Sequence, residues 1–218
     1  MIVAPEDTLY HPADLEREDV RTRLGPRDRR ALALVAEWAE EYLCKPHEAL
    51  GRSGAVCPYV QHSLREGLFW LTVGRPGDLE EIVERVLVYR DRFSDMEPVE
   101  GHDALGKTIL IVFPDLTAED GPLLDRIQKV LKPDFTELGL MIGQFYAGCP
   151  EPGLWNSDFH PLQSPVPLLA IRHMVPSDFP FLVSSSDYLD PYFDRFAHTI
   201  PERIRRTIVE ELTHEHGS

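Results

Sequence analysis

The sequence predicts an α+β fold in which helices pack on a central, mostly antiparallel or mixed sheet of about four to six strands. Two observations support this prediction. Short runs rich in β-branched and aromatic residues occur at 67–73, 107–114 and 166–175, and longer amphipathic segments separate them. In addition, no sequence period of 20–50 residues recurs, which excludes a repeat architecture.

The chain divides into an arm and one domain. Residues 1–25 carry many charges and few apolar side chains, which indicates an extended N-terminal arm. Residues 26–218 are enough for one domain with a complete hydrophobic core. We therefore predict a single α+β domain over 26–218.

Two helices are predicted before the middle of the chain. Pro26 suits the first turn of a helix whose apolar side chains recur at helical spacing as far as Tyr42. After the strand at 67–73, the sequence GRPGD forms a turn. Asp78, at the end of this turn, is a suitable N-cap for an amphipathic helix at 79–93.

The remaining elements follow the strand at 107–114. A helix is predicted at 117–131, and the segment 137–147 is ambiguous between strand and helix. After the strand at 166–175, two more helices are predicted at 186–198 and 201–215.

Composition and charge narrow the function classes. The net charge is −15, with a pI near 4.9. Such a surface repels phosphate backbones, so we expect no nucleic-acid partner. The apolar runs fall short of the roughly 18 residues that a membrane span requires, so we expect no membrane association. Three cysteines, an odd number, indicate free thiols in a reducing cytoplasm.

The common catalytic and nucleotide-binding signatures are absent from the sequence. It contains no GxGxxG after a strand, no GxxxxGK followed by Ser or Thr, no HExxH, no GxSxG and no CxxC. The residues left for chemistry are histidines, cysteines and nearby carboxylates.

A proline-bracketed loop, DFHPLQSP, lies directly before the strand at 166–175. Such a stiff loop can aim a side chain, and the side chain in question is His160. A haem needs a strong axial ligand, an apolar slot for its ring and cations for its propionates. His160 is the candidate ligand, and Cys57, in the motif Cys57-Pro58-Tyr59, is the alternative.

Other residues complete the predicted site. Arg172 and His173 are candidates for the propionates or a substrate carboxylate, because arginine binds carboxylates in a bidentate manner. Asp178 and Asp158 are candidates to bind a cationic substrate or to orient His160. The predicted apolar slot consists of Phe159, Leu162, Leu168, Phe69 and Trp70.

Simpler interpretations of the same residues stay open. His160 also fits a hydrogen-bonded histidine that braces a proline loop, and Cys57 fits a small buried apolar residue. A non-haem iron site needs two histidines and one carboxylate on one face, which Asp158, His160 and His173 would supply.

The order of these features resembles that of known proteins. The sequence carries Cys57-Pro58-Tyr59, then strands at 67–73 and 107–114 around an acidic amphipathic helix, then FHPLQSP and a strand at 167–174. This order is similar to that of an uncharacterised family of actinobacterial proteins, and over 50–200 it more distantly resembles the YqcI/YcgG family. Members of the latter are haem-dependent oxygenases that N-hydroxylate guanidino groups of arginine-like substrates.

The resemblance implies roles for individual residues. The His-Pro step of the family corresponds to His160-Pro161, its serine to Ser164, and its cysteine–aromatic motif to Cys57 with Tyr59. With the candidates above, the predicted cofactor-binding residues are His160, Cys57, Tyr59, Phe159, Ser164, Arg172 and His173.

The chain departs from the family at two places. Pro165 or Val166 stands where the family has a basic residue after the serine, and the nearest arginine is Arg172. After the next strand, Ser177-Asp178-Phe179-Pro180 replaces an asparagine-proline-histidine pattern. The resemblance therefore implies haem binding more strongly than it implies the substrate.

We therefore predict a cytoplasmic haem b protein in which His160 is the proximal ligand and Cys57 the alternative one. As an oxygenase it would use dioxygen and an electron donor to act on a small amine, guanidine or amino-acid-like substrate in specialised metabolism. Catalytic roles are assigned to His160, Arg172 and Asp178. The alternatives are a non-catalytic haem- or small-ligand-binding protein, a non-haem iron enzyme and a metal-independent interaction module. Whether the protein forms a homodimer is left open.

Overall fold

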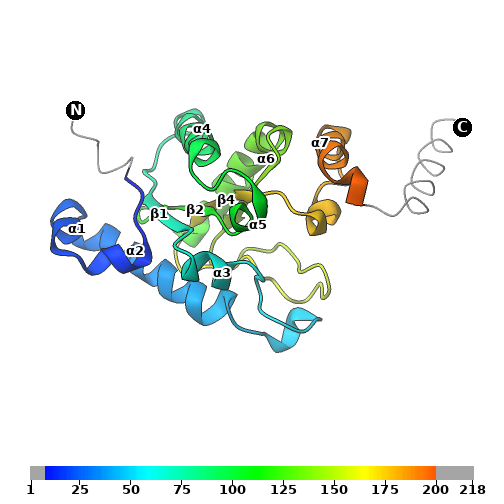
Figure 1. The fold of residues 1–218 in the computed structure, drawn as a ribbon. Helices are drawn as coiled ribbons and strands as arrows, with labels where there is room; N and C mark the ends of the chain where they lie inside the picture. Colours follow the sequence, from blue (N-terminus) through cyan, green and yellow to red (C-terminus); the bar gives the residue numbers. More distant parts are fainter. Residues whose placement is uncertain (1–7, 200–218) are drawn as a thin grey trace, which may run out of the picture.

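The computed structural model describes residues 8–199 of the chain, and its centre is a four-stranded mixed sheet (Figure 1). The strands lie in the order β1–β2–β4–β3. β1 (Phe69–Val73) and β2 (Thr108–Val112) are parallel, whereas β4 (Leu168–His173) is antiparallel to both β2 and β3 (Leu140–Phe145). This confirms the predicted α+β class and the mixed sheet.

One face of the sheet is covered by α4 (Leu79–Asp95) and α6 (Gly121–Glu137), which lie side by side along it (Figure 1). α4 begins where Asp78 accepts a hydrogen bond of 3.0 Å from the backbone N–H of Glu81, the cap that the sequence predicts. The apolar side chains of both helices recur at helical spacing and pack on alternate residues of the strands. The buried residues on this face include Ile82, Val86, Phe93, Leu124, Ile127, Ile109, Ile111, Ile142, Leu169 and Ile171.

The other face is covered most fully over β1 and β2. α2 (Pro26–Trp38), its π-helical continuation (Ala39–Leu43) and α3 (Val60–Arg65) lie on this side (Figure 1). The buried residues here include Leu32, Val35, Leu43, Phe69, Leu71, Val73, Leu110, Val112 and Leu168.

Residues 8–24 belong to this second core, which corrects the predicted extended arm. Tyr10 pairs with Leu71 through two backbone hydrogen bonds of 2.8 Å, which adds an antiparallel bridge at β1. A 3-10 turn (Pro12–Glu16) and the short helix α1 (Glu18–Arg23) follow. The apolar side chains of this segment are buried in the core, namely Tyr10, Leu15, Val20 and Leu24. Their burial holds the segment on the domain despite its many charges.

The remaining elements settle the ambiguous part of the sequence. The segment 137–147 contains the last residue of α6 and then β3. α7 (Ser186–Phe196) corresponds to the helix predicted at 186–198 and packs beside α6 (Figure 1). The short elements are α5 (Gly101–Ala104) and 3-10 turns at Glu48–Leu50, Ala118–Asp120, Pro176–Phe181 and Ala197–Thr199. The helix predicted at 201–215 lies outside the described residues.

A helix that crosses a bilayer needs about 20 mostly apolar residues. Within residues 8–199, no helix is both long enough and apolar enough to cross a bilayer.

Candidate functional site

The face of the sheet that carries α2 and α3 is incompletely covered over β3 and β4. Leu110 and Leu168 on this face are buried, but Gly143, Ala170 and Arg172 are only half-buried. β4 is an interior strand, since β2 and β3 pair with it on either side. The sheet is therefore less completely covered at these residues than over β1 and β2.

The smallest side chains of the two strands lie within this accessible surface. Gly143 is directly opposite Ala170 in the ladder. A Cβ atom added to Gly143 would have one close neighbour among the described residues, the edge of the Phe145 ring at 3.5 Å. A glycine inside a strand often marks a place where a ligand approaches the backbone closely. We call the pair Gly143–Ala170 the floor of the candidate site.

The first wall of the site is the segment 44–59, which leads into α3 and carries Cys57 and Tyr59. Cys57 is held by a hydrogen bond of 2.9 Å from its backbone N–H to the carbonyl of Leu43. Burial has the largest effect on the pKa of Arg172 and lowers it. The ion pair with Asp178 and, more weakly, the charges of Cys57 and Tyr59 raise that pKa, and the net direction is upward. Cys57 and Tyr59 therefore lie close enough to Arg172 to interact with its charge.

The second wall is the proline-rich loop 150–166, which packs against the first wall. The ring of Phe159 stacks on that of His47, with centroids 4.7 Å apart. Asn156 donates a hydrogen bond of 2.8 Å from Nδ2 to the carbonyl of Ala49, which is 107 residues away in sequence. These contacts join two distant segments on the α3 side of the sheet (Figure 1).

Phe159 and Ser164 give the second wall its shape. The carbonyl of Phe159 accepts a hydrogen bond of 2.7 Å from the backbone N–H of Gly153. The hydroxyl of Ser164 donates a hydrogen bond of 2.6 Å to the carbonyl of Val166. Phe159 and Ser164 are both buried. The contacts of these two predicted cofactor-binding residues thus fix the conformation of the loop.

His160 follows Phe159 in the second wall and is half-buried. Its Nδ1 atom is buried and has no hydrogen-bond partner within residues 8–199. Buried polar atoms are nearly always hydrogen-bonded, so an unpartnered one calls for an explanation such as an ion, a ligand or a water molecule. In the described part of the chain, the ring therefore does not brace the loop through Nδ1, as the simpler interpretation supposes.

Arg172 and Asp178 form an ion pair with each other. Two hydrogen bonds, of 2.7 and 2.6 Å, join the guanidinium to the two carboxylate oxygens. Asp178 is 2% exposed and also accepts a hydrogen bond of 2.8 Å from the backbone N–H of Val175. This argues against the predicted catalytic or substrate-binding role of Asp178, because its carboxylate already has a cation partner inside the protein.

His173 lies on the opposite face of the sheet from Arg172, because neighbouring residues of a strand point to opposite faces. Its ring packs beside Phe93 of α4, with centroids 5.0 Å apart. Burial, and after it the charges of Lys107 and Arg195, lower its pKa to about 4, so the imidazole is neutral at neutral pH. Arg172 and His173 therefore cannot both hold the propionates of one haem.

The same placement argues against the non-haem iron site. His173 does not share a face with the second wall, so it cannot join Asp158 and His160 around one metal ion. Asp158 is exposed, and its backbone N–H donates a hydrogen bond of 3.0 Å to Oδ1 of Asn156. Among residues 8–199 there is no group of three or more His, Cys, Asp or Glu side chains that could hold a metal ion.

The predicted apolar slot is not assembled as one surface. Phe69 and Leu168 are buried in the core next to α2. Trp70 packs on the α4 side, where its ring lies on His11 with centroids 3.5 Å apart. Of the predicted slot residues, Phe159 and Leu162 lie in the second wall, but Leu162 packs against the core on the α4 side.

The family of the chain is shown by its sequence. Residues 32–207 match a family model described as Domain of unknown function (DUF6875). The chain belongs to the DUF6875 family. No curated protein and no solved structure matches the chain. The DUF6875 match begins inside α2 and includes the floor, both walls and every predicted site residue, whereas the resemblance to the YqcI/YcgG family stays a prediction.

The floor of the DUF6875 domain is the part of the site that sequence reasoning missed. Gly143 and Ala170 carry no group that suggests chemistry. The available signal was a glycine inside the apolar run LMIGQF, because glycine is disfavoured in a strand that only needs to be buried. The pairing of Gly143 with Ala170 depends on the strand register, which cannot be predicted from the sequence.

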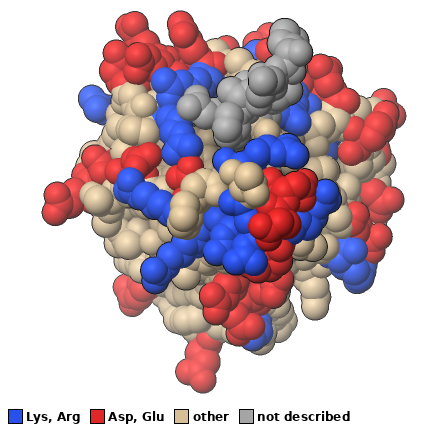
Figure 2. Space-filling view, turned by 90° about the vertical axis from the view of Figure 1, so that its left-hand side faces the viewer, with Lys and Arg blue, Asp and Glu red and all other residues tan. Residues whose placement is uncertain are grey.

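Charged residues gather on another side of the DUF6875 domain. Figure 2, viewed from the left-hand side of Figure 1, shows Lys and Arg side chains packed between acidic ones. On α1, on α2 and in the segment before them, the basic residues have acidic partners: Arg17 with Asp19 at 3.1 Å, Arg29 with Glu16 at 3.2 Å, and Arg27 with Asp115. Such exposed pairs offset each other's charge, so we do not place the ligand here.

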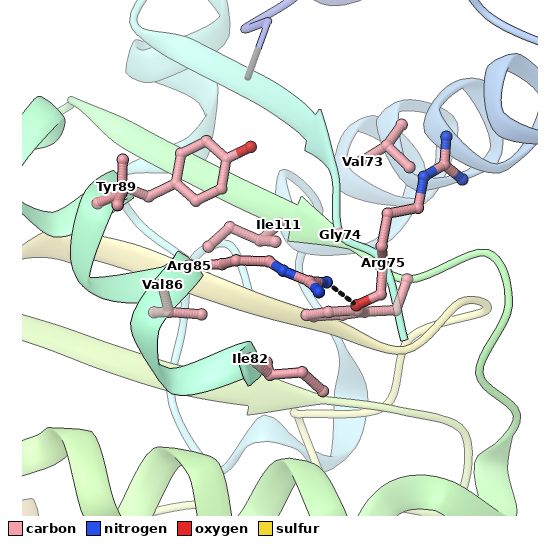
Figure 3. Close-up of a pocket in the computed structure, with 10 residues that line it drawn as sticks. Val73, Gly74, Arg75, Ile82, Arg85, Val86, Tyr89 and Ile111 are labelled. Atoms are coloured by element: carbon pink, nitrogen blue, oxygen red, sulfur yellow. Dashed lines mark hydrogen bonds between the residues drawn. The ribbon is translucent and has the colours of Figure 1, made fainter. Parts of the chain in front are cut away.

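Two cavities lie away from the walls and the floor. One, of about 140 Å³, lies between α4 and the carboxyl ends of β1 and β2 (Figure 3). It is mostly apolar, and its two arginines are engaged: Arg75 pairs with Asp28 at 2.6 Å, and Arg85 donates to the carbonyl of Arg75 at 3.1 Å. The other, of about 320 Å³, lies beside α7. The linings of these two cavities include neither His160 nor Cys57.

Proposed function

We propose that this DUF6875 protein binds haem b on the accessible half of its sheet and is a haem-dependent oxygenase. The observation that carries the proposal is the buried Nδ1 atom of His160, which has no partner within the described residues. The donor set suits haem, because an imidazole and the Cys57 thiol are both established axial ligands. At Gly143 the floor leaves space beside the backbone that a larger side chain would fill.

Each wall has a defined role in this proposal. His160 is the proximal ligand and Cys57 the alternative one. When bound, the haem would supply the iron at which dioxygen is activated. Phe159, stacked on His47, limits the movement of the neighbouring imidazole.

Arg172 is proposed to hold a propionate or a substrate carboxylate. Its guanidinium has five N–H groups, and three of them donate to Asp178 and to the carbonyl of His173. The other two have no partner within residues 8–199 and can donate to a carboxylate, and about a third of the side chain, 33%, is exposed. The pair with Asp178 then serves to fix the direction of this guanidinium.

The proposed substrate is a small amine, guanidine or amino-acid-like molecule, with dioxygen and an electron donor as co-substrates. A net charge of −15 favours encounters with cationic molecules. Asp158, two residues before His160, is exposed and is the carboxylate that we propose for contact with the substrate cation. We also propose a cytoplasmic location, with which three unpaired cysteines are consistent.

The experiment that tests the proposal has two steps. The purified protein is first titrated with hemin and followed by its Soret absorbance, which should give a saturable band with one haem per chain. The loaded protein is then given a chemical reductant, dioxygen and arginine or a simple alkylamine, and the products are analysed by mass spectrometry. A hydroxylated product is expected. A protein that takes up no hemin would reject both haem binding and oxygenase activity.

A non-catalytic haem-binding protein is the second candidate. The observation that favours it is the Arg172–Asp178 ion pair, which leaves Asp178 without a role in proton transfer. The two candidates differ in the second step of the same experiment. A stable haem complex that yields no hydroxylated product with any cationic substrate supports the binding protein.

A further inference from the structure

Two of the three cysteines lie opposite one another in the first wall. The backbone N–H of Val56 donates to the carbonyl of Lys45, and that of Cys57 donates to the carbonyl of Leu43, each at 2.9 Å. Pro46 and Ala55 form an antiparallel bridge next to them. Cys44 lies between Leu43 and Lys45, so these contacts place it across from Cys57.

The distance between the two cysteines follows from this hydrogen bonding. The Cα atoms of Cys44 and Cys57 are separated by the Leu43–Cys44 amide, one hydrogen bond and one N–Cα bond. Standard bond lengths then place the two Cα atoms within about 7 Å of each other. A disulfide joins Cα atoms that are about 4.4–6.8 Å apart, a range that lies within this limit.

The surroundings of the two thiols also suit a bond between them. Both side chains are half-buried and pack on the same core next to α2. Burial has the largest effect on the pKa of Cys44 and raises it, and the neighbouring Cys57 raises it further. Cys149, by contrast, is fully buried in the core on the α4 side of the sheet. The structure thus contains one close pair of accessible thiols and one isolated thiol that serves as an internal control.

We propose that Cys44 and Cys57 form a reversible disulfide when the protein meets a peroxide. The two thiols lose two electrons and two protons, an S–S bond forms, and the O–O bond of hydrogen peroxide breaks to give two water molecules. The new bond closes a loop that carries His47 and Ala49, the residues that hold the second wall. Oxidation therefore restricts the movement of the first wall. It also leaves the Cys57 sulfur unable to bind a ligand as a thiol.

The test uses the full-length protein without added haem, so its outcome does not depend on the proposed function. The protein is treated with hydrogen peroxide, alkylated with iodoacetamide, and digested with trypsin without reduction. Trypsin cleaves after Arg52, between the two cysteines, so a disulfide joins two peptides that otherwise separate. We expect one linked pair that contains Cys44 and Cys57, its loss on treatment with dithiothreitol, and an unlinked Cys149.

Other outcomes would overturn the proposal. Peptides in which both thiols are alkylated after peroxide treatment would show that the pair does not oxidise. Cys57 recovered as a sulfinic acid in an unlinked peptide would show that it reacts alone. In the variant Cys44→Ser, the linked pair should disappear and Cys57 should be alkylated or over-oxidised. If that variant does not fold, the wild-type measurement alone still decides the question.

Discussion

The two faces of β4 differ in how completely they are covered. Leu169 and Ile171 point toward α4 and α6 and are fully buried, whereas Ala170 and Arg172 point toward the α2 side and stay partly accessible. Burial of apolar area is the main stabilising contribution to a folded domain, so the closed face stabilises this one. The accessible face contributes less and is where we propose that the ligand binds. Substitutions on the two faces should therefore separate stability from binding.

The largest effect on stability is expected on the closed face. Ile171→Ala removes a fully buried side chain and leaves a cavity, which should lower the free energy of unfolding by about 2–5 kcal/mol. Ala170→Ser, at the neighbouring position on the accessible face, should change it by less than about 1 kcal/mol. Urea unfolding followed by circular dichroism measures both. Equal losses in the two variants would contradict the distinction between the faces.

The next largest loss of stability is expected at the ion pair at the end of β4. Asp178→Asn removes the charge partner of Arg172 from a site where Asp178 is 2% exposed. We expect a loss of about 1–3 kcal/mol, because one buried polar partner is left less well satisfied. The same variant should also bind hemin more weakly, because the Arg172 guanidinium loses the partner that fixes its direction. Unchanged stability together with lost activity would instead restore the catalytic role that the sequence predicts for Asp178.

His173, on the closed face, should make stability depend on pH. Its pKa in the folded protein is about 4, below the ordinary value of 6.5, because burial first and then Lys107 and Arg195 disfavour the charged form. The unfolded chain therefore takes up the proton first, so this contribution is complete above about pH 6.5 and is lost as the pH falls toward 4.

The expected loss from His173 is on the order of 2 kcal/mol, less than the full shift implies because the ring is partly exposed. Urea unfolding of wild type and His173→Gln at pH 7.5 and 4.5 measures it. The variant should lose less stability between the two pH values than the wild type does. Identical losses would show that His173 titrates normally.

The smallest effect on stability is expected at the floor. Gly143→Val places a β-branched side chain, which strands favour, where the described residues leave space. The free energy of unfolding should change by less than about 1 kcal/mol, while hemin affinity should fall because the side chain occupies the floor. Hemin titration and urea unfolding of the same preparation test both statements. If the variant binds hemin as tightly as the wild type, the ligand does not lie on the floor.

The sequence predicted most of the fold because the strands and helices have clear periodic patterns. β1, β2, β4, α4 and the cap at Asp78 are where the patterns place them. The N-terminal segment was misjudged because its buried residues, Tyr10, Leu15, Val20 and Leu24, fit neither the period of a strand nor that of a helix. β3 was ambiguous because Gly143 interrupts its apolar run.

The site was harder to predict than the fold. The separation of Arg172 from His173 follows from strand alternation and could have been read from the sequence. The partner of Asp178 could not, because an ion pair between β4 and the turn after it depends on how the chain bends. The floor and the contacts between the two walls depend on register and on residues more than a hundred positions apart, such as Ala49 and Asn156.

The central claim is that His160 holds a haem beside the floor. The most direct test is a hemin titration of wild type, His160→Ala and the matched control His102→Ala, which alters an exposed histidine on α5. Wild type and His102→Ala should give the same saturable Soret band, and His160→Ala should lose it or shift it to the band of another ligand. An identical band in His160→Ala, or no band in the wild type, would contradict the claim.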